Sequence, residues 1–164
     1  VRRPRKPDAA ASEADERTVR TAALALLAGR DFAREELAKR LARRGYQPAI
    51  VETVVGGLVA ERLLSESRFT AQFIRQHAGR GHGPLRIRMD LRERGVADSD
   101  IEEALATAGE DWVAVAREAR RKRFGTSGPS DFRERARQGR FLQYRGFSSE
   151  QIRAALGPGD DIEP

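Results

Sequence analysis

Apolar residues recur along the chain at intervals of three and four, which is the spacing of an amphipathic helix. No segment of four to eight residues shows the apolar–polar alternation of a half-buried strand. The pattern predicts nine helices, near residues 18–28, 32–44, 48–62, 66–78, 84–94, 98–107, 111–124, 130–145 and 148–156. The expected fold class is therefore all-α.

One six-residue pattern, Leu-x-x-Arg-Gly-apolar, occurs three times. Its glycines, Gly45, Gly95 and Gly146, lie 50 and then 51 residues apart, a period typical of repeat proteins. We expect three three-helix repeats at 18–64, 65–109 and 110–157, stacked in an elongated, curved, solenoid-like array because each small unit needs a neighbour to complete its core. Residues 1–17 are expected to form a disordered N-terminal tail and residues 158–164 a C-terminal tail.

The repeated pattern has the features of a helix stop. In the Schellman motif a glycine in the left-handed conformation ends the helix. The residue that follows the glycine packs on the residue four positions before the glycine. This count pairs Leu41 with Tyr46, Leu91 with Val96, and Leu142 with Phe147. All three segments therefore predict the same helix end.

A new helix is expected after each stop. Pro48 suits the first helical position, and Ser148 with Gln151 forms a capping box. The middle helix is expected to begin near Asp98 or Ser99, with Glu102 placed to pair with Ser99. Apolar pairs at matching offsets from the glycines then predict one buried stripe per helix: Val51 and Val55, Ile101 and Leu105, Ile152 and Leu156.

The charge of the chain points to a polyanionic partner. Lys and Arg number 31 against 25 acidic residues, giving a formal net charge of +6 and a pI near 10.6. Ten basic and three acidic residues lie between residues 117 and 145. This density favours binding to DNA phosphates or to an acidic protein surface. For each arginine taken alone, a solvated surface position is the alternative.

Twelve basic residues in the second and third repeats are the candidates for contact with the partner. They are Arg86, Arg88, Arg92, Arg117, Arg120, Arg121, Lys122, Arg123, Arg133, Arg137, Arg140 and Arg145. Few aromatic residues lie among them, so base stacking is not expected as the main mode of binding. Four aromatic residues are instead predicted to lie in the core: Trp112, Phe124, Phe132 and Phe141. Tyr144 is left open.

Candidate catalytic chemistry is sparse. The chain has no cysteine, and its two histidines, His77 and His82, stand five residues apart without an acidic cluster in the sequence beside them. The segment from Gly79 to Gly83 is rich in glycine, but no Gly-Lys-Ser/Thr follows it, so it is not a P-loop. We predict a non-enzymatic protein with no cofactor and no metal site, in which His82 is a solvated loop residue. No apolar run has the length of a membrane span.

Several motifs together resemble the RecX family of regulatory proteins, over roughly residues 20–157. They are Leu63-Leu64-Ser65-Glu66-Ser67-Arg68-Phe69, Gly81-His82-Gly83-Pro84-Leu85-Arg86-Ile87, and Phe141-Leu142-Gln143-Tyr144-Arg145-Gly146-Phe147-Ser148. Two positions depart from the family pattern. Arg62 stands where the family has glycine, and Gly56-Gly57 lies inside a predicted helix, which it should weaken or bring close to a neighbour.

The resemblance implies a function that periodicity and charge alone do not. RecX-like proteins bind the RecA filament on single-stranded DNA, suppress ATP hydrolysis and strand exchange, and limit filament growth or promote disassembly. The implied protein is a cytoplasmic monomer with RecA and single-stranded DNA as partners, and with no membrane or small-molecule substrate. A helix-turn-helix module that binds DNA without RecA is the alternative, and a small nuclease is a remote third. The sequence does not distinguish capping of filament ends from insertion along the filament or from removal of RecA subunits.

Overall fold

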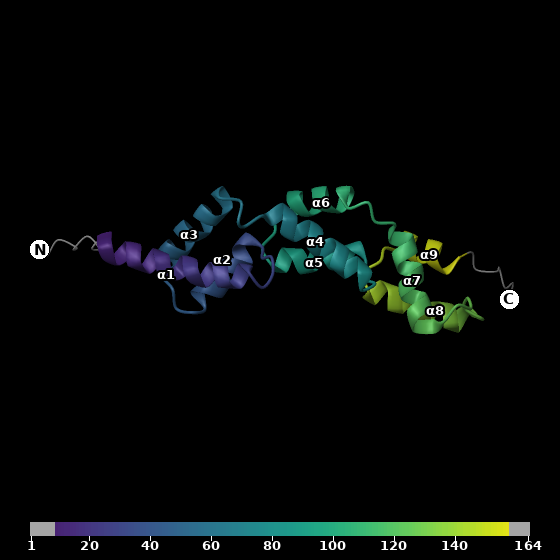
Figure 1. Cartoon of the computed structure of the whole chain (residues 1–164). Helices are drawn as coiled ribbons and strands as arrows, with labels where there is room; N and C mark the ends of the chain where they lie inside the picture. Colours follow the sequence, from purple (N-terminus) through teal and green to yellow (C-terminus); the bar gives the residue numbers. More distant parts are fainter. Residues whose placement is uncertain (1–8, 158–164) are drawn as a thin grey trace, which may run out of the picture. The chain divides into compact units, whose positions relative to one another are not determined.

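A computed structural model describes the backbone of residues 9–157 and the side chains of residues 15–157. Within this part of the chain nine helices and no strands form (Figure 1), which confirms the all-α prediction. The helices are α1 (Ala9–Leu27), α2 (Arg34–Ala42), α3 (Pro48–Ala60), α4 (Glu66–Gly79), α5 (Pro84–Glu93), α6 (Asp98–Thr107), α7 (Trp112–Phe124), α8 (Phe132–Tyr144) and α9 (Ser149–Leu156). No helix among the described residues is long and apolar enough to cross a membrane.

The first helix begins earlier than expected. α1 starts at Ala9, so the prediction of a disordered tail is wrong for residues 9–17. Ala9, Ala10, Ala11 and Ala14 explain the difference, because alanine has the highest helix propensity of all residues. Residues 1–8 and the predicted tail at 158–164 lie outside the described residues.

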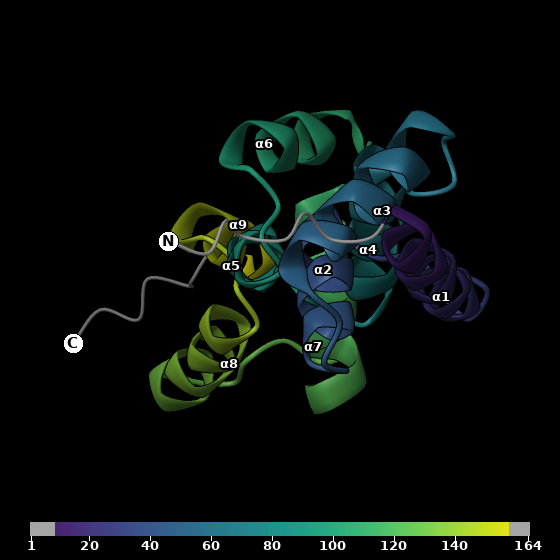
Figure 2. The ribbon, with the colours of Figure 1, turned by 90° about the vertical axis from the view of Figure 1, so that its left-hand side faces the viewer.

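The chain forms two compact units. The first runs to Phe69 and includes Arg94–Val96, and the second comprises Thr70–Glu93 and the residues from Ala97 onward. In the first unit α1 lies beside α3 in both views of the ribbon (Figures 1 and 2), and α2 packs on α3. Its core is formed by Val19, Ala23, Phe32, Leu37, Leu41, Val51, Val54, Val55, Leu58 and Leu64.

The second unit contains most of the second repeat and all of the third. α9 packs against both α7 and α8, and α5 packs against α6. A buried cluster joins the helices of the third repeat: Ala116, Ala119, Leu142, Phe147 and Ala155. In the second repeat Ile74, Ile87, Leu91 and Ile101 are fully buried. The predicted stripe is confirmed at Val51, Val55 and Ile101, whereas its members Leu105, Ile152 and Leu156 are half-buried.

The three predicted helix stops have the left-handed glycine that the motif requires. Gly45, Gly95 and Gly146 have φ values of 89°, 82° and 91°. The third stop shows both Schellman hydrogen bonds, because the N–H of Gly146 donates to the carbonyl of Gln143 and that of Phe147 to the carbonyl of Leu142, at 3.0 and 3.2 Å. The three leucines of the pattern are fully buried: Leu41, Leu91 and Leu142.

A further stop lies at the end of α3, at Arg62, where the family resemblance leads us to expect glycine. Arg62 has a φ of 59° and is the one described non-glycine residue with positive φ. Its N–H donates to the carbonyl of Val59, and the N–H of Leu63 donates to that of Leu58, at 3.0 and 2.9 Å. These are the two bonds of a Schellman motif, so arginine occupies a conformation that favours glycine.

All three predicted helix starts are confirmed, including that of α6 at Asp98. Pro48 opens α3, and Ser148 forms the capping box of α9. The predicted pairing of Ser99 with Glu102 is wrong, because α6 already begins at Asp98 and Glu102 instead pairs with Arg88 at 2.5 Å. At the start of α8 the side chain of Asp131 accepts the N–H of Glu134, at 2.7 Å.

Two other positions refine the sequence-based expectations. α3 runs unbroken through Gly56 and Gly57, and no described atom of another segment lies within 4 Å of a Cβ built at either. The core prediction is wrong for Phe132, which is 82% exposed, because it lies off the face of α8 that buries Gln138 and Leu142. Three predicted core aromatics are half-buried, namely Trp112, Phe124 and Phe141, and Tyr144 is exposed.

Candidate binding surface

A tight joint connects the second and third repeats inside the second unit. The N–H groups of Gly83 and Leu85, at the start of α5, donate to the carbonyls of Arg145 and Gly146, at 2.8 and 3.0 Å. Helix N-termini leave N–H groups without partners inside the helix, and the joint supplies acceptors from the end of α8. Opposite ends of two helix dipoles therefore meet at this joint.

The joint depends on two glycines. A Cβ on Gly83 would overlap the carbonyl of Gly146, and a Cβ on Gly146 would overlap the backbone nitrogen and Cβ of Arg86. In the first unit Gly95 approaches Glu35 of α2 in the same way. Gly45, the glycine of the first stop, has no described atom near its Cβ position. The stop of one repeat thus docks against the second helix of the repeat before it.

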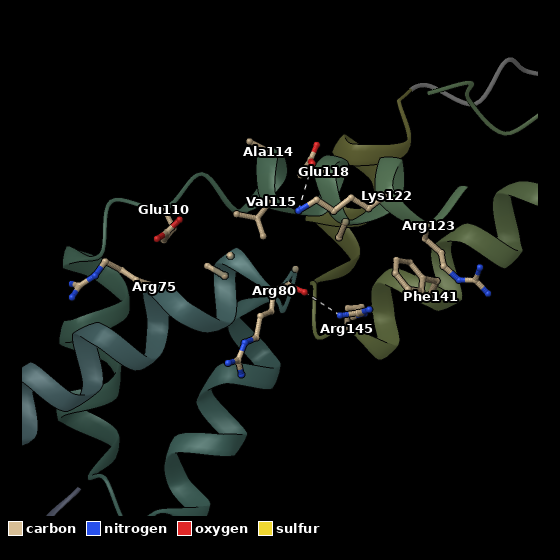
Figure 3. Close-up of a pocket in the computed structure, with 14 residues that line it drawn as sticks. Arg75, Arg80, Glu110, Ala114, Val115, Glu118, Lys122, Arg123, Phe141 and Arg145 are labelled. Atoms are coloured by element: carbon tan, nitrogen blue, oxygen red, sulfur yellow. Dashed lines mark hydrogen bonds and ion pairs between the residues drawn. The ribbon is translucent and has the colours of Figure 1, made fainter. Parts of the chain in front are cut away.

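A concave pocket of about 540 Å³ lies beside this joint (Figure 3), and we call it the basic groove. It is formed by α4, the turn after α4, α7 and α8. The residues that line it are Arg75, Ala78, Gly79, Arg80, Gly81, Glu110, Ala114, Val115, Glu118, Ala119, Lys122, Arg123, Phe141 and Arg145. Five of these side chains are basic and two are acidic, and small residues form much of the remaining wall.

Internal contacts hold part of this charge in place. Arg145 donates to the carbonyl of Arg80 at 3.1 Å, and its guanidinium lies 5.1 Å from the centre of the Phe141 ring. Lys122 lies 3.6 Å from Glu118 (Figure 3), which also accepts from Arg121. The hydrogen bond from Arg121 holds the pKa of Glu118 below its usual range, so this carboxylate stays charged. Arg75, Arg80 and Arg123 form no ion pair with any described residue.

Arg120 is the most deeply buried of the twelve candidate residues. It is 8% exposed, and its guanidinium donates to the carbonyls of Gly125, Thr126 and Ser127 and to the side-chain oxygen of Gln138. Arg120 therefore has little of its side chain available to a partner, and its predicted contact stays a prediction. Because the loop after α7 turns its carbonyls inward, this arginine fixes the loop against α8.

Six other candidates are engaged with acidic neighbours, so less of their charge is available to a partner. Arg86 pairs with Asp90 inside α5, whereas Arg88 and Arg92 of α5 pair with Glu102 and Asp98 of α6. In the third repeat Arg121 and Lys122 share Glu118, and Arg137 pairs with Glu134. Arg117 donates instead to the carbonyl of Ala154, at 3.1 Å. Of the twelve candidates, Arg123, Arg133 and Arg140 are exposed and form neither an ion pair nor a side-chain hydrogen bond with a described residue.

Sequence comparison places these features in a known family. The RecX models of the first, second and third three-helix domains match residues 20–58, 65–105 and 109–156. A regulatory protein RecX from Halorhodospira halophila (strain DSM 244 / SL1) is 51% identical over 152 residues, which cover 93% of this chain and 92% of the relative. The chain belongs to the RecX family. A second regulatory protein RecX, from Pseudomonas fluorescens (strain SBW25), is 45% identical over 87% of this chain and 92% of its own length.

Solved RecX structures share the fold. A crystal structure of regulatory protein RecX superposes with a TM-score of 0.74 at 21% identity, over 92% of this chain and 78% of that one. RecX from Lactobacillus salivarius gives 0.72 at 20% identity, over 85% and 93%. RecX proteins are regulators and not enzymes, in agreement with the prediction from the sequence. The recurrence of three-helix domains in the family confirms the three-helix repeats.

Two basic residues of the basic groove were not predicted from the sequence. Arg75 and Arg80 lie on α4 and just after it, far along the chain from the dense stretch at 117–145. Packing in the second unit places them beside Lys122, Arg123 and Arg145. Local charge density could not find them, because the groove combines residues from two repeats.

The two histidines also differ from expectation. His82 is half-buried, and its Nδ1 lies 3.0 Å from Nδ1 of His77, whose ring is 3.9 Å from Asp90. The prediction of a solvated loop histidine without an acidic neighbour is wrong. The turn at Gly81 carries His82 back over α4, and α5 brings Asp90 alongside. Burial first, and then the positive charge of Arg145, holds the pKa of His82 below its usual value.

Proposed function

We propose that this RecX-family protein is a negative regulator of RecA that binds the RecA filament on single-stranded DNA. The observation that carries the proposal is the basic groove, whose Arg75, Arg80 and Arg123 have no ion pair within the described part of the chain. Guanidinium groups bind phosphate and carboxylate with two hydrogen bonds, and the groove is concave enough to hold such a group. Family membership supplies the identity of the partner.

The proposed mechanism is occupancy. A filament repeats its surface along its axis, so several contacts of modest strength made by one regulator add up to avidity for the filament over the free subunit. The groove, together with Arg133 and Arg140 on the exposed side of α8, would hold DNA phosphates or acidic residues of the filament. Occupancy would slow ATP hydrolysis and strand exchange, and would limit filament growth or promote disassembly. We further expect a monomer in the cytoplasm.

A charge reversal tests the groove. The triple variant Arg75→Glu, Arg80→Glu, Arg123→Glu should weaken inhibition of the RecA ATPase on single-stranded DNA by about tenfold or more, as judged from the half-inhibitory concentration. A matched control reverses three exposed arginines outside the groove, Arg43, Arg44 and Arg153, and should retain inhibition. Circular dichroism would establish that both variants are folded. Equal inhibition by the wild type and the folded groove variant would contradict the proposal.

Binding to DNA alone separates the proposal from its alternative. Fluorescence anisotropy with single-stranded DNA, without RecA, should show weak binding that falls steeply with salt and does not depend on sequence. Loss of each arginine–phosphate contact should reduce the slope of log K against log salt by about one. Tight, sequence-dependent binding without RecA would instead favour an independent DNA-binding module.

A further inference from the structure

His77, His82 and Asp90 converge at one point of the second unit. Each offers one ligand atom, and the three atoms lie within 4.8 Å of one another. His77 is at the end of α4, His82 is in the turn that follows, and Asp90 is on α5, so three different elements meet. Only 14% of the side chains of His77 and Asp90 is exposed. No other group of three such residues is found in the described chain.

The separations suit a small divalent ion. Zinc binds nitrogen and oxygen at about 2.0–2.2 Å in tetrahedral sites, which puts neighbouring ligand atoms about 3.3 Å apart. The two Nδ1 atoms are 3.0 Å apart, and Nδ1 of His77 is 3.9 Å from Oδ2 of Asp90. These distances bracket the tetrahedral edge. The third separation, between His82 and Asp90, is within 4.8 Å, so rotation of the side chains would complete the geometry.

Neighbouring contacts fix the orientation of two of the three groups. The His77 ring stacks on Phe73, with ring centres 3.9 Å apart and planes inclined by 17°. The Oδ1 atom of Asp90 accepts from Nε of Arg86 at 3.3 Å, and the other oxygen, Oδ2, is the one near His77. Such outer contacts are a regular feature of metal sites, because they hold the ligands in place before the ion arrives.

We propose that His77, His82 and Asp90 form a binding site for a transition-metal ion of the zinc type. Two imidazoles and one carboxylate are a donor set typical of zinc, and they leave a fourth position for water or for a side chain of a partner. The ion joins the end of α4 to α5. It thereby stabilises the turn that contains Gly83. A side chain at position 83 would clash with Gly146, and the N–H of Gly83 donates to the carbonyl of Arg145 in the joint between repeats.

The tautomers of the two histidines provide a direct test. The chain contains only two histidines, so both imidazoles can be assigned by nitrogen-edited NMR of the full-length, chelator-treated protein. Without metal, the Nδ1–Nδ1 hydrogen bond requires one ring to carry its proton on Nδ1. One equivalent of Zn²⁺ should shift both rings together and leave both protonated at Nε2. The melting temperature should rise in the same titration.

Ligand variants decide whether the site is the one proposed. His82→Gln and Asp90→Asn should each weaken Zn²⁺ binding, measured by competition with a chromophoric chelator, by about tenfold or more. Asp100→Asn, which changes an exposed acid of the same unit, is the matched control and should bind as the wild type does. Unchanged imidazole signals in wild-type protein at tenfold excess Zn²⁺, or equal affinity of the folded Asp90→Asn variant, would overturn the proposal. The RecA assays do not enter this test, so the two proposals can fail separately.

Discussion

Gly146 and the backbone of Arg86 lie closer together than any side chain at position 146 would allow. The approach is close because the carbonyl of Gly146 accepts the N–H of Leu85 at 3.0 Å. One glycine therefore has two tasks. Its positive φ ends α8, and its missing side chain admits α5.

The two tasks can be separated by comparing Gly146→Ala with Gly45→Ala. Both glycines have φ near 90°, so alanine should cost about 1–2 kcal/mol at either position. At position 45 nothing described lies near the new Cβ, and no further loss is expected. At position 146 the methyl group must displace the backbone of α5, and we expect a loss about 2 kcal/mol larger. Urea unfolding followed by circular dichroism would measure both.

The fluorescence of Trp112, the single tryptophan, reports on the second unit and should follow the loss at position 146. If the two variants lost equal stability, the joint would contribute little.

Arg120 should be a major determinant of stability. Arg120→Ala would leave the buried Gln138 and three loop carbonyls without their donor, and an unsatisfied buried group costs about 1–3 kcal/mol. We expect a total loss of about 3 kcal/mol, read from Trp112 fluorescence in urea. The neighbouring Arg121→Ala is the control and should change stability little, since Arg121 is exposed and pairs only with Glu118. Similar stability of both variants would contradict the structural role of Arg120.

Arg62→Gly should stabilise the protein. Arginine pays a steric penalty of about 1–2 kcal/mol at positive φ, and glycine removes it at the expense of some extra freedom in the unfolded chain. The net gain should be about 1 kcal/mol in the free energy of unfolding. Arg62→Ala retains the left-handed strain and should bring no such gain. A destabilised Arg62→Gly variant would show that contacts of the arginine side chain stabilise the fold by more than its left-handed backbone conformation destabilises it.

Glu134 should make the third repeat sensitive to acid. Its hydrogen bond from Gln138, and then its pairing with Arg137, hold the pKa of Glu134 below the ordinary value. A carboxylate with a lowered folded-state pKa contributes stability that is complete above the unfolded pKa and is lost as pH falls through the folded pKa. Glu134→Gln should therefore reduce the difference in urea midpoint between pH 7 and pH 3. An undiminished difference would locate the acid response at other carboxylates.

The helix ends were the most predictable part of the molecule. At Gly45, Gly95 and Gly146 the helix end depends on the conformation of one residue and on a hydrophobic contact between residues a few positions apart. Such local interactions can be predicted from a sequence. The early start of α1 was missed because charge and proline near the terminus outweighed the alanines that follow. At Arg62, a departure from the family pattern located a left-handed residue that no helix propensity would reveal.

The site was less predictable, because charge density in a sequence does not distinguish partners inside the fold from partners outside it. Arg120 and Arg121 are adjacent in the chain, yet one is buried beneath a loop and the other is exposed. Arg75 enters the groove through packing between repeats. Asp90 of α5 lies 3.9 Å from His77 at the end of α4, thirteen positions earlier in the chain. Each of these relationships depends on tertiary contacts between distant segments.

Asp131 gives the joint between repeats a further meaning. The N–H groups at the start of α5 donate to the carbonyls of Arg145 and Gly146, in the stop of the next repeat. At the start of α8 the acceptor is instead the side chain of Asp131, which precedes the helix. The third repeat thus caps the start of its own second helix with a side chain, and no described atom lies within 4 Å of a Cβ built on Gly45, the glycine of the first stop. The joint between repeats therefore has a direction, because the stop of one repeat accepts the N–H groups that start the second helix of the repeat before it. A duplicated repeat could join at the far end only if a new stop took over the position that Asp131 now serves, so a single aspartate limits how readily the array can grow by duplication.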